Sequence, residues 1–251
     1  MNLQEQTRQH YQKAPFDWGQ EKIRNNYLKY SGIGKFINKY LKRGNKEKTL
    51  DCGCGIGLIS DELLKRGYDV ISVDLTETSQ KLAKRFYNIN VVRASNLNLS
   101  FKDNTFDIVM SSGVVHHTPN TKRAVEELVR VLKSKGLLYL LIYRKPSIHY
   151  LERITTGALI RKIHKKNKWI IDNILVRLMI PLIYLGRALK FRTLKRASYQ
   201  EYKNYFYDRF ITPQAAFHTK KEVESWLRRI KIIDYWKGNF GYHHNFVGRK
   251  L

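Results

Sequence analysis

Two acidic residues and three closely spaced glycines stand where a nucleoside could be held. The run D-C-G-C-G-I-G extends from Asp51 to Gly57, and Asp74 ends the apolar run 70–73. Glycines at alternate positions let the backbone approach a ligand, because they carry no side chain. A carboxylate at the tip of the next strand can accept hydrogen bonds from ribose hydroxyls. The pattern therefore predicts the nucleoside-binding half of an open α/β sheet.

The spacing of the glycines argues against a dinucleotide or a nucleoside triphosphate. A dinucleotide loop has the pattern G-x-G-x-x-G, whereas the glycines here fall at 53, 55 and 57, and position 58 is leucine. No Lys or Arg between Asp51 and Asp61 could meet a phosphate, and Asp51 itself would repel one. A ligand with an ammonium group and a sulfonium centre suits Asp51 better.

These residues resemble a known family. The run from Asp51 to Gly57 resembles the first motif of class I S-adenosylmethionine-dependent methyltransferases, and Asp74 resembles their ribose-binding acid. Three later stretches are similar to the type 11 subgroup: residues 97–107, the loop 111–117 after the fourth strand, and the helix, turn and strand at 126–138. The resemblance covers about residues 48–143 and implies S-adenosylmethionine as the cofactor.

The family's cofactor contacts can be carried onto matching positions. The family usually places an acid near the end of the third strand, against the adenine; this chain has Ser95 there with Asn96 beside it, and either can accept a hydrogen bond. The cofactor-binding residues that the resemblance implies are Asp51, Gly53, Cys54, Gly55, Gly57, Asp74, Leu75, Ser95, Asn96, Leu97, Ser112 and His117.

Methyl transfer from a sulfonium makes few demands on catalytic side chains. The main task is to hold the nucleophile and the methyl group in reacting geometry, and a base is needed only where the acceptor carries a proton. His116 and His117 follow the fourth strand, at the sheet edge where ligands bind, and are the candidate bases. We expect no metal site, since Cys52 and Cys54 are too few to hold zinc and fit better as small fillers of the loop.

The elements that must position these residues follow from the apolar periodicity. We expect a Rossmann-like α/β fold with a mostly parallel seven-stranded sheet, helices on both faces, and a helical insert after the fifth strand. One helix is expected over 21–41 before the first strand, and the capping pair Thr219 and Glu222 predicts a late helix. Strands are expected at 68–73, 90–92, 106–111, 136–143, 230–236 and 244–247, and further helices at 56–64, 78–87 and 119–132.

The chain is expected to divide into four parts. Residues 1–45 form an N-terminal arm or lid, 46–145 the cofactor-binding core, 146–211 a basic helical insert, and 212–251 the end of the core fold. Within the insert, an apolar stripe of Ile171, Leu175, Leu178, Leu182 and Leu185 predicts a helix that buries this face, and the helix is too charged to span a bilayer.

The net charge is +26, and its excess lies outside the expected core. Residues 144–251 hold 24 basic and 7 acidic residues, whereas residues 51–143 hold 12 and 10. This balance favours a polyanionic partner such as a membrane surface, a nucleic acid or an acidic substrate; the alternative is a lysine-rich compositional bias. The N-terminus is polar, unlike a signal peptide, so we expect a cytoplasmic protein with peripheral contact to an anionic membrane.

The leading hypothesis is a methyltransferase acting on O, C or N of a small-molecule or lipid-like acceptor. An RNA methyltransferase is the first alternative, motivated by the same charge. Against it, the sequence shows no appended RNA-binding module and no acidic-Pro-Pro-aromatic run. A non-catalytic cofactor-binding scaffold is the second alternative, and the intact glycine loop and Asp74 argue against it.

Overall fold

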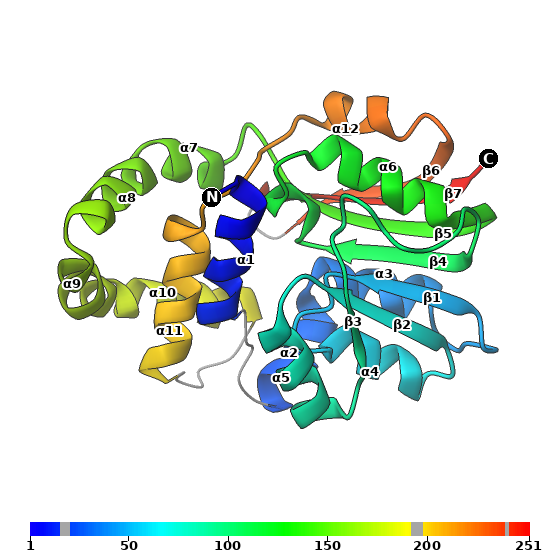
Figure 1. Ribbon diagram of the computed structural model, residues 1–251, viewed down its shortest axis with the longest axis horizontal. Coiled ribbons are helices and arrows are strands. Elements are labelled where there is room, and N and C mark those ends of the chain that lie inside the picture. Colours follow the sequence, from blue (N-terminus) through cyan, green and yellow to red (C-terminus); the bar gives the residue numbers. More distant parts are fainter. Residues whose placement is uncertain (16–20, 192–197, 239–240) are drawn as a thin grey trace.

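A seven-stranded sheet forms the core of the computed structural model, which describes residues 1–15, 21–191, 198–238 and 241–251 (Figure 1). The strand order is β3-β2-β1-β4-β5-β7-β6. The strands are β1 (Lys48–Cys52), β2 (Asp69–Asp74), β3 (Val91–Arg93), β4 (Phe106–Ser112), β5 (Leu132–Tyr143), β6 (Ile230–Lys237) and β7 (His243–Lys250). β1 to β5 are parallel, and β7 runs antiparallel to both β5 and β6. The predicted fold class is confirmed.

Helices cover both faces of this sheet. On one face, α3 (Gly32–Tyr40) and α4 (Leu58–Lys65) bury an apolar layer that includes Phe36 and Leu63. On the other, α6 (Thr121–Val131) and α12 (Lys220–Trp226) bury a layer that includes Leu128 and Val223. The helix α5 (Glu77–Tyr87) packs beside β2 and β3. β5 is apolar on both faces because it lies between these two layers.

The expected single helix over 21–41 is wrong, because the chain forms two helices there. α2 (Glu21–Tyr30) ends at Ser31, and α3 begins directly after it. The Ser31 side chain accepts a hydrogen bond from the Gly34 amide, which is the geometry of a helix N-cap. The apolar period continues across this break, so the periodicity alone hides it.

The basic insert folds into helices beside the sheet, at the left of Figure 1. Its elements are α7 (Ile148–Ile154), α8 (Thr156–Lys166), α9 (Lys168–Ile170), the π-helical turn η2 (Ile171–Leu175), α10 (Val176–Phe191), α11 (Tyr199–Phe206) and a second π-helical turn η3 (Tyr207–Ile211). A separate apolar cluster, with Ile171, Val176, Ile183 and Phe206 fully or almost fully buried, holds these helices together.

The predicted apolar stripe of the insert does not stay on one buried face. Ile171 is fully buried, but Leu178, Leu182 and Leu185 are 68%, 62% and 55% exposed. The cause is η2, because a π-helical turn adds a residue to the helix and rotates everything after it by about 100°. The expectation that this helix is too charged to span a bilayer is wrong by composition: within the described chain, Lys168–Gly186 is long and apolar enough to cross a membrane, and 17% of it is buried.

The N-terminal helix α1 (Leu3–Lys13) bridges the core and the insert. On the core side, Gln4 Nε2 donates to Ser95 Oγ (2.6 Å) and Thr78 Oγ1 donates to the Gln12 carbonyl (2.9 Å). On the insert side, Tyr11 Oη donates to Asp208 Oδ1 (2.9 Å). Figure 1 shows α1 beside α11, between the sheet and the outer insert helices.

A buried lysine closes the C-terminal end of α6. Lys250 is 3% exposed, and its Nζ donates to the carbonyls of Val129 (2.7 Å) and Leu132 (2.6 Å) and to Asn104 Oδ1 (2.9 Å). A cation at this position is stabilised by the carbonyl ends of the helix. β7 is thereby tied to α6 by a polar contact that its sequence pattern does not reveal.

We predict that Lys250→Met lowers the free energy of unfolding by about 2–3 kcal/mol, since it leaves buried carbonyls without a charged donor. Urea unfolding followed by circular dichroism measures this change. Lys231→Met, at an exposed position of neighbouring β6, is the matched control and should change stability by less than about 0.5 kcal/mol. Equal effects of the two substitutions would contradict the role given to Lys250.

Candidate active site

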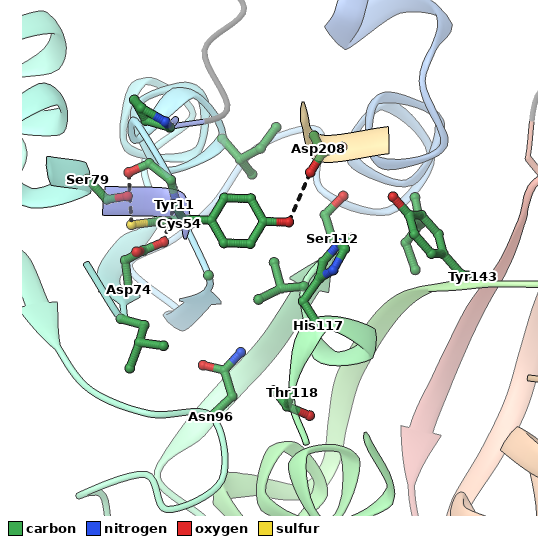
Figure 2. Close-up of a pocket in the computed structure, with 18 of the residues that line it drawn as sticks. Tyr11, Cys54, Asp74, Ser79, Asn96, Ser112, His117, Thr118, Tyr143 and Asp208 are labelled. Carbon is green, nitrogen blue, oxygen red and sulfur yellow. Dashed lines mark hydrogen bonds between the residues drawn. The ribbon is translucent and has the colours of Figure 1, made fainter. Parts of the chain in front are cut away.

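A cavity of about 310 Å³ opens at the carboxyl ends of β1 and β4. The strand order reverses between these two strands, and ligands of open α/β sheets bind at such a point. The glycine loop forms one end of the cavity, and α1, α2, the insert and the segments after β3 and β4 contribute to the rest of its lining, together with residues of β5 and β7. Figure 2 shows these side chains converging from the core and from the insert.

Asp74 fixes the glycine loop and still faces the cavity. Its Oδ2 accepts from the Gly55 amide (3.1 Å), and its Oδ1 accepts from the amide and the hydroxyl of Thr76 (both 3.0 Å). The amides of Gly53 and Cys54 donate to the Val73 carbonyl. A carboxylate has about four acceptor positions and three of them are taken, so Asp74 retains one, on Oδ2, for a ribose hydroxyl.

The three loop glycines have different roles. A Cβ on Gly55 would meet nothing within 4 Å, so it would project into the open cavity, and its φ is +54°. A Cβ on Gly53 would lie 2.4 Å from Val114, and one on Gly57 would press on Ala83 and Ile89. Gly53 and Gly55 line the cavity, whereas Gly57 lets α4 pack against α5. The open space at Gly55 fits the close approach of a ligand.

Asp51 lines the cavity but is only 3% exposed. Ser60 Oγ donates to its Oδ2 (2.7 Å), and Ser72 Oγ donates in turn to Ser60 Oγ (2.7 Å). Burial, opposed by the hydrogen bond from Ser60 and aided by the nearby charge of Asp74, raises the pKa of the Asp51 carboxyl to about 6. A bound cation would lower this pKa again, which is the property expected of a site for an ammonium and a sulfonium.

The expected adenine side of the cavity is polar and uncharged. Ser95 and Asn96 both line it, together with Leu75. Ser95 Oγ accepts from Gln4, and Asn96 Oδ1 accepts from the Cys52 thiol (3.1 Å). Leu97 does not belong to the lining and packs instead against the apolar layer under α6.

The two cysteines are small fillers of the loop. Both are free and buried, and burial raises the pKa of each thiol well above its usual value. They therefore stay neutral and unreactive at physiological pH. Among the described residues, no group of three or more His, Cys, Asp or Glu side chains could hold a metal ion.

Of the two histidines after β4, His117 faces the cavity and His116 lies behind it. His116 is fully buried, stacks on Tyr143 with ring centroids 3.7 Å apart, and accepts at Nδ1 from the Tyr143 amide. His117 Nδ1 lies 2.6 Å from the Gln214 carbonyl, so that nitrogen must carry the proton and Nε2 is the acceptor. Burial lowers the pKa of His117 to about 4, which keeps the ring neutral at pH 7.

The end of the cavity away from the glycine loop is formed by residues that the cofactor motifs do not cover. Tyr205 and Asp208 line this end, whereas the neighbouring Tyr207 donates to Asp172 Oδ1 (2.6 Å). Arg209 stacks on Tyr242 and pairs with Glu152. The lining at this end comprises Tyr11, Tyr27, Ser112, Tyr143, His149, Tyr205, Asp208, Arg209, Tyr242, His243 and Asn245.

Tyr11 crosses the cavity between its two ends. Figure 2 shows its ring extending from the side of Cys54 and Asp74 towards Asp208. Its ring packs edge-on against His117, with centroids 5.6 Å apart. His10, the preceding residue of α1, lies with Nε2 2.9 Å from Thr212 Oγ1. The arm expected to be a lid thus contributes side chains to the cavity itself.

Comparison with known proteins agrees with this geometry. Residues 50–140 match the family model described as a methyltransferase domain. Over 116 residues the chain is 37% identical to an uncharacterised protein of Methanocaldococcus jannaschii, covering 45% of this chain and 49% of that protein. Over 127 residues it is 33% identical to a demethylmenaquinone methyltransferase of Corynebacterium kroppenstedtii, covering 51% and 55%. The chain thus spans about half the length of these relatives.

Solved structures share the fold at low sequence identity. A SAM-dependent methyltransferase from Aquifex aeolicus superposes with a TM-score of 0.53 at 16% identity, covering 94% of this chain and all of that one. The glycine loop and Asp74 both lie in the segment that matches the family model, as the resemblance in sequence implies. Residues 50–140 thus carry a methyltransferase domain of type 11, and the fold around that domain is shared with solved S-adenosylmethionine-dependent methyltransferases.

Proposed function

We propose that this chain transfers a methyl group from S-adenosylmethionine to a planar, ring-containing small molecule or lipid-like acceptor. The observation that carries the proposal is the composition of the single continuous cavity. One end has the glycine loop and Asp74, and the other has the rings of Tyr143, Tyr205 and Tyr242. Aromatic walls favour stacking on a flat acceptor ring. The similar C. kroppenstedtii protein is named for a quinone-type acceptor, demethylmenaquinone, which supports the same class.

Different residues along the cavity would hold different parts of the cofactor. When bound, S-adenosylmethionine supplies an electrophilic methyl group on its sulfonium. Asp74 would accept a hydrogen bond from a ribose hydroxyl, and Asp51 would face the positive charge of the methionine portion. The narrow cavity holds the acceptor in line with the methyl group, which is the main source of acceleration in such a displacement.

His117 can remove a proton from an acceptor hydroxyl or ring carbon. The Gln214 carbonyl holds the Nδ1 proton, so Nε2 presents its lone pair. Its depressed pKa makes His117 a weak base, which suits an acceptor that becomes acidic as the bond to carbon forms. Tyr11 and the insert exclude water from this part of the cavity, so the proton transfer takes place in a low-dielectric site.

The proposed function is tested by following label from the methyl group of the cofactor into a panel of acceptors. The panel should contain hydroquinones and catechols with and without an alkyl tail, and bulk RNA. We expect label in the ring compounds, and His117→Gln should lower kcat by about 10²–10⁴-fold while leaving the affinity for S-adenosylhomocysteine within about twofold. Transfer to RNA alone, or unchanged turnover in the variant, would contradict the acceptor class or the base, respectively.

The space at Gly55 gives a second prediction, on the cofactor alone. Gly55→Ala should abolish detectable binding of S-adenosylhomocysteine in calorimetry, because the new Cβ enters the open cavity. The protein should stay folded, with a cost of about 1–2 kcal/mol for a side chain at positive φ. Gly67→Ala is the matched control, since Gly67 also has a positive φ but lies outside the cavity lining. Binding that survives in Gly55→Ala would place the ligand elsewhere.

The raised pKa of Asp51 predicts a pH dependence of cofactor binding. A cation prefers the ionised carboxylate, so affinity should fall as pH drops through about 6 and be about tenfold lower at pH 5 than at pH 7.5. His10 and His117 have pKa values of about 4 and stay neutral over this range. Asp51→Asn should bind weakly at all pH values and remove this dependence. A tenfold fall that persists in the variant would assign the titration to another group.

The raised pKa of Asp51 has the opposite effect on the stability of the ligand-free protein: stability falls as pH rises. A carboxyl whose folded pKa lies above its unfolded value stabilises the protein fully below pH 4 and loses this contribution as pH rises through about 6. Unfolding experiments should therefore show that the wild-type protein loses stability, relative to Asp51→Asn, by about 2–3 kcal/mol between pH 4 and pH 7.5. A constant difference between the two proteins would contradict the raised pKa.

A further inference from the structure

The outer face of the basic insert carries a row of exposed apolar side chains. Within α9, η2 and α10, these residues recur three or four positions apart, and their exposed fractions run from 43% to 68% in the stretch from Ile174 to Leu189. Large apolar groups in such a row mark a contact surface rather than ordinary scatter. The row, called here the outer stripe, consists of Ile174, Leu178, Leu182, Leu185 and Leu189.

The opposite side of the same helix is fixed to the protein. Val176 is fully buried and Ile183 is 6% exposed, and both pack in the apolar cluster of the insert with Phe206 of α11. α10 also contacts α2 and α11. Val176 and Ile183 thus hold one side of the helix against the insert. The outer stripe is the side that this packing leaves exposed to a surface.

Basic side chains precede the outer stripe along the chain. Lys162, Lys165, Lys166 and Lys168 are exposed, and among the described residues none of them makes an ion pair. Between residues 153 and 200 the sequence has twelve Lys and Arg against one acid, Asp172. Asp172 already has partners of its own, because Lys203 Nζ lies 3.0 Å from its Oδ2 and Tyr207 donates to its Oδ1.

A partner of this surface must accept both the exposed aliphatic side chains and the unpaired lysines. A second copy of the chain would bring one lysine cluster against another, and like charges repel. A nucleic acid would satisfy the lysines but would leave five aliphatic side chains in contact with water or phosphate. An anionic bilayer satisfies both, since its headgroups attract the lysines and its acyl boundary receives the aliphatic groups.

We propose that the insert docks on an anionic lipid surface, with α10 lying in the plane of the interface. The outer stripe inserts into the boundary between headgroups and acyl chains, and the four lysines contact the anionic headgroups. Arg177, exposed on α10 and stacked on Tyr199, lies within the same segment and adds a further cation. The docking rests on the exposed surface alone and does not depend on the proposed methyl transfer.

Docking also gives the cavity a defined position. Tyr205, Asp208 and Arg209, from the end of the insert, line the acceptor end of the cavity. The same insert therefore touches both the proposed membrane and the proposed acceptor site. An acceptor with an acyl or isoprenoid tail could keep that tail in the bilayer while its ring enters the cavity.

Co-sedimentation of the full chain with vesicles tests the docking without cofactor or acceptor. We expect binding to vesicles of 30% phosphatidylserine in phosphatidylcholine, little binding to phosphatidylcholine alone, and weakening with added salt. The triple variant Lys165→Gln, Lys166→Gln, Lys168→Gln should bind more than tenfold less tightly. Leu178→Gln with Leu182→Gln should also bind at least tenfold less tightly and should remain folded, because both leucines are exposed.

Matched controls separate docking from general charge and hydrophobicity. Lys42→Gln, Lys102→Gln and Lys135→Gln remove the same charge from exposed sites outside the insert, and Leu64→Gln with Phe86→Gln remove two exposed apolar groups of the core. Both control variants should keep vesicle binding within about twofold of wild type. Equal losses in control and test variants would overturn the proposal.

Two other outcomes would also overturn it. Loss of binding in the lysine variant but not in the leucine variant would show a polyelectrolyte surface, suited to RNA as well as to lipid. A dimer in sedimentation analysis that disappears in the leucine variant, without vesicle binding by wild type, would assign the outer stripe to self-association. Vesicle binding by wild type together with failure of every ring acceptor would leave the docking intact and remove only the proposed function.

Discussion

The whole site depends on the reversal of strand order between β1 and β4. From β1 the chain proceeds to β2 and β3 on one side, and it returns to place β4 and β5 on the other. The loops after β1 and β4 therefore diverge and leave a crevice at their carboxyl ends. Asp74 stabilises one wall by binding the Gly55 amide, and His117 stands on the other. The arm and the insert complete the cavity only because this crevice exists.

The core half of the site could be predicted from sequence because its determinants are local. The loop from Asp51 to Gly57 and the acid Asp74 lie within one βαβ unit, so their spacing encodes their geometry. The strand and helix ranges of the core follow from apolar periods and mostly agree within two or three residues; β5 begins four residues earlier than expected. The distinct role of Gly57 could not be predicted, because it depends on Ala83 of the next helix.

The acceptor half of the site has no signal in the local sequence. Tyr11, Tyr143 and Tyr242 are far apart in the chain and meet only through the tertiary fold. The stripe predicted to be buried, from Ile171 to Leu185, was wrong for a different reason. A period of 3.6 residues assumes an uninterrupted α-helix, and η2 shifts the phase after Leu175. Asp208 likewise lies in a π-helical turn, η3, so the direction of its side chain could not be read from helical spacing.

The bridge formed by α1 has a kinetic consequence. A molecule entering the glycine-loop end must pass a helix that is hydrogen-bonded to Ser95 and Thr78 on one side and to Asp208 on the other. At about 1 kcal/mol net for each bond, opening costs a few kcal/mol. Only a small fraction of molecules is open at any moment, and an observed affinity is the intrinsic affinity scaled by that fraction. If the nucleoside leaves past α1, its release would be no faster than the opening of the N-terminal arm.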